Sequence, residues 1–182
     1  MMPHQLNWQE ICQMIPKRKA DAQKGDFGRL LCITGSRNMP GACLLSTQAA
    51  LRGGAGLVTV ATAPENPMRL AAAAPEAMWL PLETDEAGFL RSSDQNRKTL
   101  EKQLSRANAV LLGCGLGVTE ETRRLVHWVL EQAVCPVVLD ADGLNCAVSC
   151  IELSRRTGKD WILTPHPGEM ARLTGRSIPQ IQ

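Results

Sequence analysis

The stretch "NAVLLGCGLGVTEETRRLVHWVLEQAVCPVVLDADGLN", residues 108–145, decides the fold of this chain. It begins with an apolar run at 108–113 that lacks the alternation of a half-buried strand, so we predict a strand buried on both faces. A glycine-rich turn follows at 113–117, and a helical pattern occupies 119–133. A second apolar run covers 135–142. Strand, helix and strand in this order indicate a unit of two parallel strands joined by a crossover helix.

The same alternation of short apolar runs and helical patterns continues along the rest of the chain. Further strands are predicted at 29–34, 56–62, 76–82 and 160–164. Further helices are predicted at 6–15, 41–54, 66–74, 94–107, 143–150 and 167–175. We therefore predict an α/β fold in which helices cover both faces of a mainly parallel sheet. We expect one domain over 1–182, with an N-terminal helix and lead-in at 1–24 and the α/β core at 25–182.

Composition narrows the function classes. A net charge of +2, without a basic stripe interleaved with aromatic residues, argues against a nucleic-acid partner. No run reaches transmembrane length and the N-terminus lacks a signal pattern, so we expect no membrane partner and a cytoplasmic location. The seven cysteines are odd in number and form no CxxC motif, which indicates reduced, buried thiols. A homo-oligomer is compatible with the sequence.

Unusual residues follow four of the predicted strands. These are Gly35 with Ser36, the glycine-rich segment 113–117, the pair Asp140 and Asp142, and the segment 165–169. The carboxyl ends of parallel strands share one edge of a sheet, and ligands bind in the crevice there. The sequence therefore predicts one site assembled from four distant turns.

Each of these features also has a purely structural interpretation. The glycine turn, spaced GxGxG, could bring backbone N–H groups to an anionic ligand or could only make a tight turn. Asp140 and Asp142 could hold a Mg²⁺-bound or hydroxyl-bearing ligand, although Asp142 could instead cap the next helix. Asn145 is a weaker candidate, because an exposed helix position explains it equally well.

His166 stands between two prolines in "TPHPGE". The prolines restrict the backbone on both sides, which suits a fixed ligand contact better than a mobile general base. Glu169 falls in the first turn of the following helix, where the helix dipole stabilises a carboxylate. Gly41 and Ala42, with no side chain and a single methyl group, could form a floor for a flat ring or could only allow tight packing on the sheet.

Several segments together resemble one enzyme family. They are "KGDFGRLLCITGS", "MPGACLLSTQAALRGGAGLVTVAT", "GCGLG", "VVLDADGLN" and "ILTPHPGEMARLTG". In this order they resemble the NAD(P)H-hydrate dehydratases, a family of carbohydrate-kinase-like domains. The resemblance implies a three-layer α/β/α ribokinase-like fold. Cys114 is a departure, because the family usually has proline there.

The resemblance implies a metabolite-repair reaction. Hydrated NADH or NADPH carries a hydroxyl at C6; a phosphoryl group from ADP or ATP is transferred to it, and phosphate then leaves. Mg²⁺ would neutralise the nucleotide phosphates. The resemblance assigns substrate contacts to Ala42, Gly115, His166, Asp140, Asp142 and Asn145. It places Gly168 and Glu169 near the nucleotide phosphates and identifies no metal ligand.

The family's Gly-Thr-Gly-Asp motif, whose aspartate is expected to act as the base, does not occur in these 182 residues. The resemblance covers roughly the first two-thirds of the family's domain. We therefore expect a domain truncated at its C-terminus, with no catalytic base in this chain. Two alternatives stay open, a vitamin-precursor kinase of the same fold and an inactive partial domain.

Overall fold

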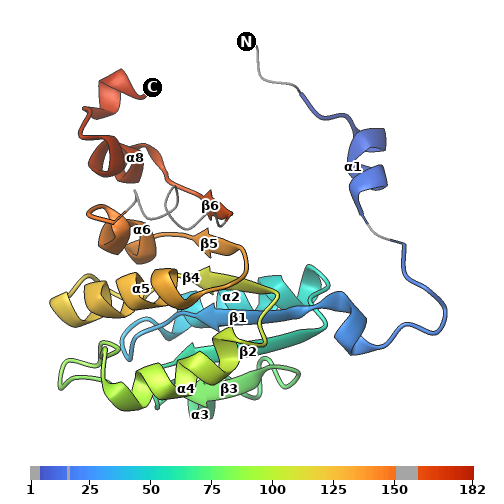
Figure 1. Ribbon diagram of the computed structural model, residues 1–182, viewed down its shortest axis with the longest axis horizontal. Coiled ribbons are helices and arrows are strands. Elements are labelled where there is room, and N and C mark those ends of the chain that lie inside the picture. The colour runs from blue at the N-terminus through green and yellow to red at the C-terminus, as the bar shows by residue number, and fades with distance from the viewer. Residues whose placement is uncertain (1–4, 16, 151–159) are drawn as a thin grey trace.

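The computed structural model describes residues 5–15, 17–150 and 160–182. Its strands form a six-stranded sheet in the order β3-β2-β1-β4-β5-β6, and every neighbouring pair is parallel (Figure 1). The strands are β1 Arg29–Ile33, β2 Leu57–Thr62, β3 Met78–Pro81, β4 Ala109–Leu112, β5 Val137–Leu139 and β6 Trp161–Leu163. The α-helices are α1 Trp8–Met14, α2 Pro40–Arg52, α3 Asn66–Leu70, α4 Asp94–Leu104, α5 Glu120–Gln132, α6 Asp142–Ala147 and α8 Pro167–Thr174. Short 3₁₀ helices occupy Lys24–Phe27 and Ile178–Gln180. The predicted parallel sheet is confirmed.

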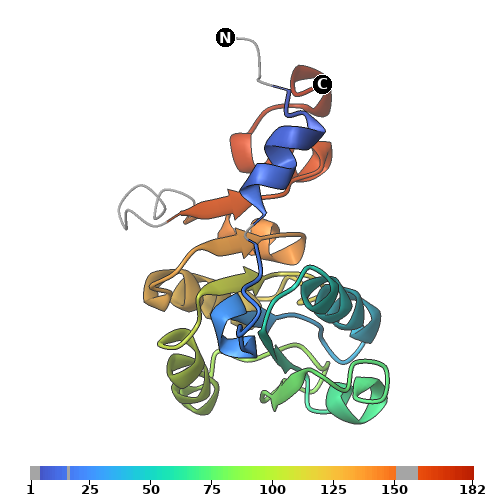
Figure 2. The same cartoon turned by 90° about the vertical axis from the view of Figure 1, so that its right-hand side faces the viewer.

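Helices cover both faces of this sheet, as the apolar strands predicted. Along β1, Leu31 and Ile33 belong to the hydrophobic cluster under α4 and α5, whereas Cys32 belongs to the cluster that also contains Cys43 of α2 and Leu70 of α3. Successive side chains of a strand point to opposite faces, so one strand serves both clusters. Figure 2 shows α4 and α5 on one side of the sheet and α2 and α3 on the other. The α/β/α layering is therefore the observed one.

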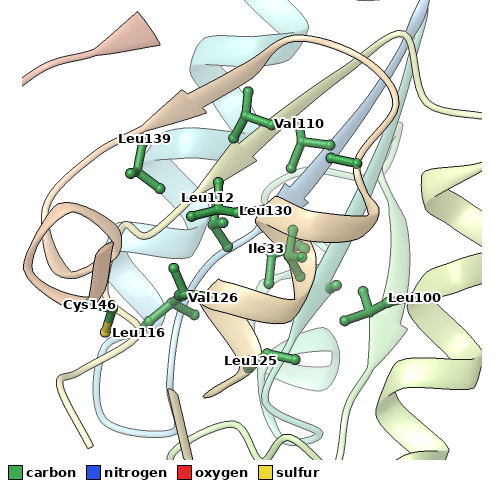
Figure 3. Close-up of a cluster of buried hydrophobic side chains, with 14 of the residues drawn as sticks. Ile33, Leu100, Val110, Leu112, Leu116, Leu125, Val126, Leu130, Leu139 and Cys146 are labelled. Carbon is green, nitrogen blue, oxygen red and sulfur yellow. The ribbon is translucent and has the colours of Figure 1, made fainter. Parts of the chain in front are cut away.

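The larger cluster lies between α5 and the strands β1, β4 and β5 (Figure 3). Helix α5 contributes four fully buried residues, Leu125, Val126, Val129 and Leu130. Their spacing places them on one face of the helix, and each stabilises the fold by about 1.5–3 kcal/mol through burial. This packing anchors α5 directly behind the glycine-rich turn.

The start of α5 is fixed by a reciprocal N-cap at Thr119. Thr119 accepts a hydrogen bond from the backbone N–H of Thr122, and the Thr122 hydroxyl accepts one from the N–H of Thr119. A threonine thus completes the reciprocal cap that glutamate usually completes. The Thr122 hydroxyl also bonds to the carbonyl of Gly117, which ties the helix start to the preceding turn.

Three predictions need correction. The helix predicted at 66–74 ends at Leu70. The strand predicted at 135–142 covers only Val137–Leu139, because its pairing with β4 and with β6 is limited to those three residues. All seven cysteines are free thiols, as expected. They are not all buried, however, because Cys12 is exposed on α1, and Cys114 and Cys135 are only half-buried.

Helix α1 buries none of its residues and stands away from the rest of the chain in Figure 1. A capping box between Asn7 and Glu10 closes its N-terminus. Pro16, which directly follows the helix predicted at 6–15 and would end it, lies outside the described residues. Within the parts of the chain that the structure describes, no helix has the length and apolar character needed to cross a bilayer.

Candidate functional site

The strands β1, β4, β5 and β6 are consecutive neighbours in the sheet, so the four turns that follow them lie side by side at its carboxyl edge. Backbone hydrogen bonds join the first two turns directly. Gly35 N–H donates to the carbonyl of Cys114 at 2.9 Å, and Ser36 N–H donates to that of Gly115 at 2.7 Å. We call this row of four turns the carboxyl rim.

The glycine turn is a close-packed backbone junction. At Gly113, which has a φ of 132°, a Cβ atom would lie 2.0 Å from the carbonyl oxygen of Asp140. At Gly115, with a φ of 69°, a Cβ atom would lie 2.7 Å from the Cβ of Ala42. Only glycine allows both the positive φ and the close approach at these positions. The turn therefore brings Gly115 against Ala42 at the N-terminal turn of α2.

The two carboxylates after β5, Asp140 and Asp142, accept hydrogen bonds from different parts of the rim. Asp142 Oδ2 accepts a hydrogen bond of 2.8 Å from the N–H of Gly117. Asp142 is the first residue of α6, so it closes the glycine turn rather than capping its own helix. Asp140 Oδ1 accepts from the Thr164 hydroxyl at 2.7 Å, and its Oδ2 accepts from the Cys114 thiol at 3.3 Å. Asp140 thus links the turns that follow β4, β5 and β6.

An unusual backbone conformation separates the two carboxylates. Ala141 has φ 51° and ψ −119°, and among the described residues no other non-glycine residue has a positive φ. Such a conformation costs on the order of 1–3 kcal/mol and persists only where its surroundings impose it. Here it allows Asp140 to face β6 and Asp142 to face the glycine turn.

His166 is the N-cap of α8. Its Nδ1 accepts a hydrogen bond of 3.0 Å from the N–H of Gly168, and its Nε2 lies 3.3 Å from Oε1 of Glu169. Glu169 is 6% exposed, and its Oε2 accepts from the backbone N–H of His166 at 3.0 Å. Both ring nitrogens are therefore engaged within one helical turn. The imidazole is held in place while its side chain stays 63% exposed.

Asn145 does not face the rim as a free polar group. Its side-chain oxygen accepts a 2.9 Å hydrogen bond from Arg172 of α8. Its backbone carbonyl accepts one of 3.2 Å from Arg123 of α5. Asn145 joins three helices, so the structure gives it a connecting role at this position.

Cys114, the departure from the family pattern, lies inside the rim. Burial, with a smaller contribution from the nearby Asp140 carboxylate, raises the pKa of its thiol to about 11. The group therefore stays protonated at neutral pH and can donate to Asp140. In this chain a thiol supports a carboxylate that a proline at this position could not reach.

The residues of the rim do not form a protein-held metal site. Within the described ranges, no group of three or more histidine, cysteine, aspartate or glutamate side chains is arranged to hold a metal ion. Asp140 and Asp142 already accept hydrogen bonds from protein donors, and Glu169 is buried in the cap of α8. A metal at this edge would therefore need most of its ligands from a bound nucleotide and water.

Sequence analysis missed two parts of the rim. Thr164 binds Asp140, and its place directly after a strand and before Pro165 could have indicated it. The conformation of Ala141 had no sequence signal, because alanine gives no hint of a positive φ.

A hollow of about 250 Å³ near Arg29 and Trp79 lies at the opposite edge of the sheet from the carboxyl rim, and it contains none of the predicted site residues.

Comparisons with known proteins agree with this geometry. The family model for NAD(P)H-hydrate dehydratases matches residues 30–181. A bifunctional NAD(P)H-hydrate repair enzyme from Coxiella burnetii is 40% identical over 97% of this chain and 33% of its own length. A ribokinase-like superfamily protein from Enterococcus faecalis is 27% identical, with a TM-score of 0.79 over 97% of this chain and 58% of that one.

A third comparison concerns an enzyme of known activity. The ADP/ATP-dependent NAD(P)H-hydrate dehydratase from Bacillus subtilis, co-crystallised with ATP and Mg²⁺, has a TM-score of 0.71 at 30% identity. The match covers 96% of this chain and 57% of that one. The chain thus spans about a third of the Coxiella relative and rather more than half of the solved domains. With its ribokinase-like sheet and its family match over 30–181, this chain belongs to the NAD(P)H-hydrate dehydratase family.

Proposed function

We propose that the carboxyl rim binds hydrated NADH or NADPH for an ADP- or ATP-dependent dehydration that restores the reduced cofactor. The single observation that carries this proposal is the close packing of Gly115 on Ala42 and Met39, which joins the glycine turn to the start of α2 at the centre of the rim. Ala42 stays partly exposed there, and its methyl group is small enough for a flat, partly saturated ring to approach closely. His166, held rigidly at the end of β6, is the imidazole available to the same ligand.

The remaining rim residues divide into contacts and supports. Asp140 has both carboxylate oxygens bonded within the protein, so it acts as a fixed negative group rather than as a mobile base. Asp142 and Asn145 hold the surrounding turns and helices in place. We therefore propose direct substrate contacts for Ala42, Gly115 and His166, and supporting roles for the two aspartates and Asn145.

The chemistry follows from the poor leaving ability of hydroxide. Transfer of the terminal phosphoryl group to the C6 hydroxyl, which loses its proton, turns that oxygen into a good leaving group. The C6–O bond then breaks with the ring-nitrogen lone pair assisting, phosphate leaves with the bonding electrons, and a proton leaves C5. Positioning and charge stabilisation dominate such phosphoryl transfers. The rim would supply the positioning of the hydroxyl-bearing ring.

The nucleotide and Mg²⁺ belong to this proposal by analogy with the Bacillus enzyme, which was co-crystallised with ATP and Mg²⁺. Gly168 and Glu169 lie at the start of α8, beside the substrate contacts. Because Glu169 is committed to the cap of that helix, we propose that it shapes the turn and does not bind the metal directly.

A binding titration tests the proposal most directly. The purified chain is titrated by calorimetry with hydrated NADH, with NADH and with ADP, and the same mixtures with Mg²⁺ are monitored for the near-ultraviolet absorbance of regenerated NADH. Saturable binding of hydrated NADH that Gly115→Ala weakens supports the proposal. A chain that fails to bind hydrated NADH contradicts it, and a phosphorylated product released from another alcohol would favour a small-molecule kinase.

A further inference from the structure

Two buried polar side chains lie beneath the turn that follows β1. Thr62, the last residue of β2, and Asn66 of α3 are both 0% exposed. The Thr62 hydroxyl donates to the carbonyl of Gly35 at 2.9 Å. The Asn66 side-chain amide donates to the carbonyl of Ser36 at 3.2 Å and to the Thr62 hydroxyl at 2.8 Å. Both carbonyls of the turn are therefore held from below.

The opposite side of the same turn holds the glycine segment. The N–H groups of Gly35 and Ser36 donate to the carbonyls of Cys114 and Gly115. A continuous series of hydrogen bonds thus runs from the end of β2, through the turn after β1, to the residue that packs on Ala42. Polarisation along such a series strengthens its members. A shift of the first member is transmitted to the position of Gly115.

Thr62 and Asn66 fill this buried space with polar groups, although apolar side chains would be more favourable there. Burying a hydroxyl and an amide costs free energy unless every polar atom is bonded. The side-chain oxygen of Asn66 has no partner within the described part of the chain, although it is buried. Apolar side chains of similar size would fill the same volume without that cost. The arrangement is better explained by a requirement for one fixed turn geometry than by stability.

We propose that Thr62 and Asn66 are positioning residues that set the place of Gly115 on the substrate rim through the Gly35–Ser36 turn. Neither residue touches the ligand, because both lie fully beneath the surface. Their part in ligand binding rests on the proposed function. Their control of the turn is independent of it.

The test compares three variants of the full chain. Thr62→Val keeps the shape of the side chain and removes its hydrogen bonds, including the one to Gly35, whereas Thr62→Ser keeps the hydroxyl. Thr47→Val is the matched control: Thr47 is equally buried, and its hydroxyl donates to the carbonyl of Cys43 within α2, at 2.8 Å, and not to the Gly35–Ser36 turn. Amide hydrogen exchange at Gly35 and Ser36 is measured by NMR, together with the affinity for hydrated NADH by calorimetry.

We expect Thr62→Val to speed exchange of the Gly35 and Ser36 amides by about fivefold and to weaken binding of hydrated NADH by a similar factor. Thr62→Ser and Thr47→Val should stay within about twofold of the natural chain in both measurements. If Thr47→Val weakens binding as much as Thr62→Val does, the effect is one of general stability and the proposal is overturned.

The two readouts separate this inference from the proposed function. If the natural chain does not bind hydrated NADH, the proposed function fails. The positioning role is then tested by the amide exchange rates of Gly35 and Ser36 alone. Faster exchange at Gly35 and Ser36 only in Thr62→Val then supports that role. Unchanged exchange at both amides overturns it, whatever the ligand measurements show.

Discussion

The two halves of the carboxyl rim are built by different means. At the turns after β1 and β4, backbone meets backbone, and the contacts are made by glycines with no room for a side chain. At the turns after β5 and β6, side chains make the contacts: Asp140 and Asp142 accept hydrogen bonds from neighbouring turns, and His166 caps the start of α8. Changes in the first half should therefore reduce both stability and ligand binding, whereas changes in the second half should act mainly on ligand binding.

The change at Gly113 should be the most damaging. Gly113→Ala forces alanine to a φ of 132° and places its Cβ 2.0 Å from the carbonyl oxygen of Asp140. Strain and overlap together should lower the free energy of unfolding by about 4 kcal/mol, measured by urea denaturation. Gly25→Ala is the control, because no atom lies within 4 Å of the added Cβ. A similar loss in both variants would contradict the close-packed junction.

Gly115→Ala separates steric contact from backbone strain. Gly115 and Gly175 share a φ of 69°, but only the first has a neighbour, Ala42, in the way of a Cβ. We expect Gly115→Ala to cost about 2 kcal/mol of stability and Gly175→Ala about 1 kcal/mol. Only Gly115→Ala should also abolish calorimetric binding of hydrated NADH. Equal losses of unfolding free energy in the two variants would mean that Ala42 can shift away from the added methyl group at no cost.

His166→Ala should act mainly on the ligand. Because the side chain is exposed, its removal should cost only about 1 kcal/mol of stability through the lost helix cap. The affinity for hydrated NADH should fall by at least about tenfold. His127→Ala is the control, since His127 bonds to the carbonyl of Cys146 on α6, which places it outside the rim. An unchanged affinity in His166→Ala would remove the histidine from the site.

The smallest effect should appear at alkaline pH. The raised pKa of Cys114, about 11 against an ordinary value of 9.0, means that the folded chain keeps a proton that the unfolded chain loses between those values. The free energy of unfolding should therefore fall as the pH rises from about 9 towards 11. Cys114→Ser removes this titration and keeps a donor for Asp140. Urea midpoints at several pH values should fall less steeply in that variant, and an identical slope would contradict the thiol's contribution.

Much of the rim could be located before the fold was known. Apolar runs without alternation indicated strands buried on both faces, and that pattern requires a parallel sheet with shared carboxyl ends. The turns after β1, β4, β5 and β6 were therefore assigned to one edge, and the strand order confirms it. Their direct contact with substrate stays a prediction, as do the nucleotide and the metal.

The sequence could not show which side chains would become hydrogen-bond partners. Asp142 looked like a possible helix cap, yet it closes the glycine turn at Gly117, 25 residues away. Asn145 looked like a surface residue or a ligand contact, yet Arg172 binds it from α8. Such pairings join residues that are distant in the chain, and local propensity contains no information on them.

The layers, the parallel sheet, the edge that carries the turns and the family could all be predicted from the amino-acid sequence. They follow from periodicity, glycine content and local motifs, which act over a few residues. The folded chain was needed to show which side chains bond to one another, that Ala141 adopts a positive φ, and that Thr62 and Asn66 hold the first turn from beneath. The reason is physical: buried polar groups take whatever partner the packing brings within hydrogen-bonding distance, and that partner is fixed only when the layers close.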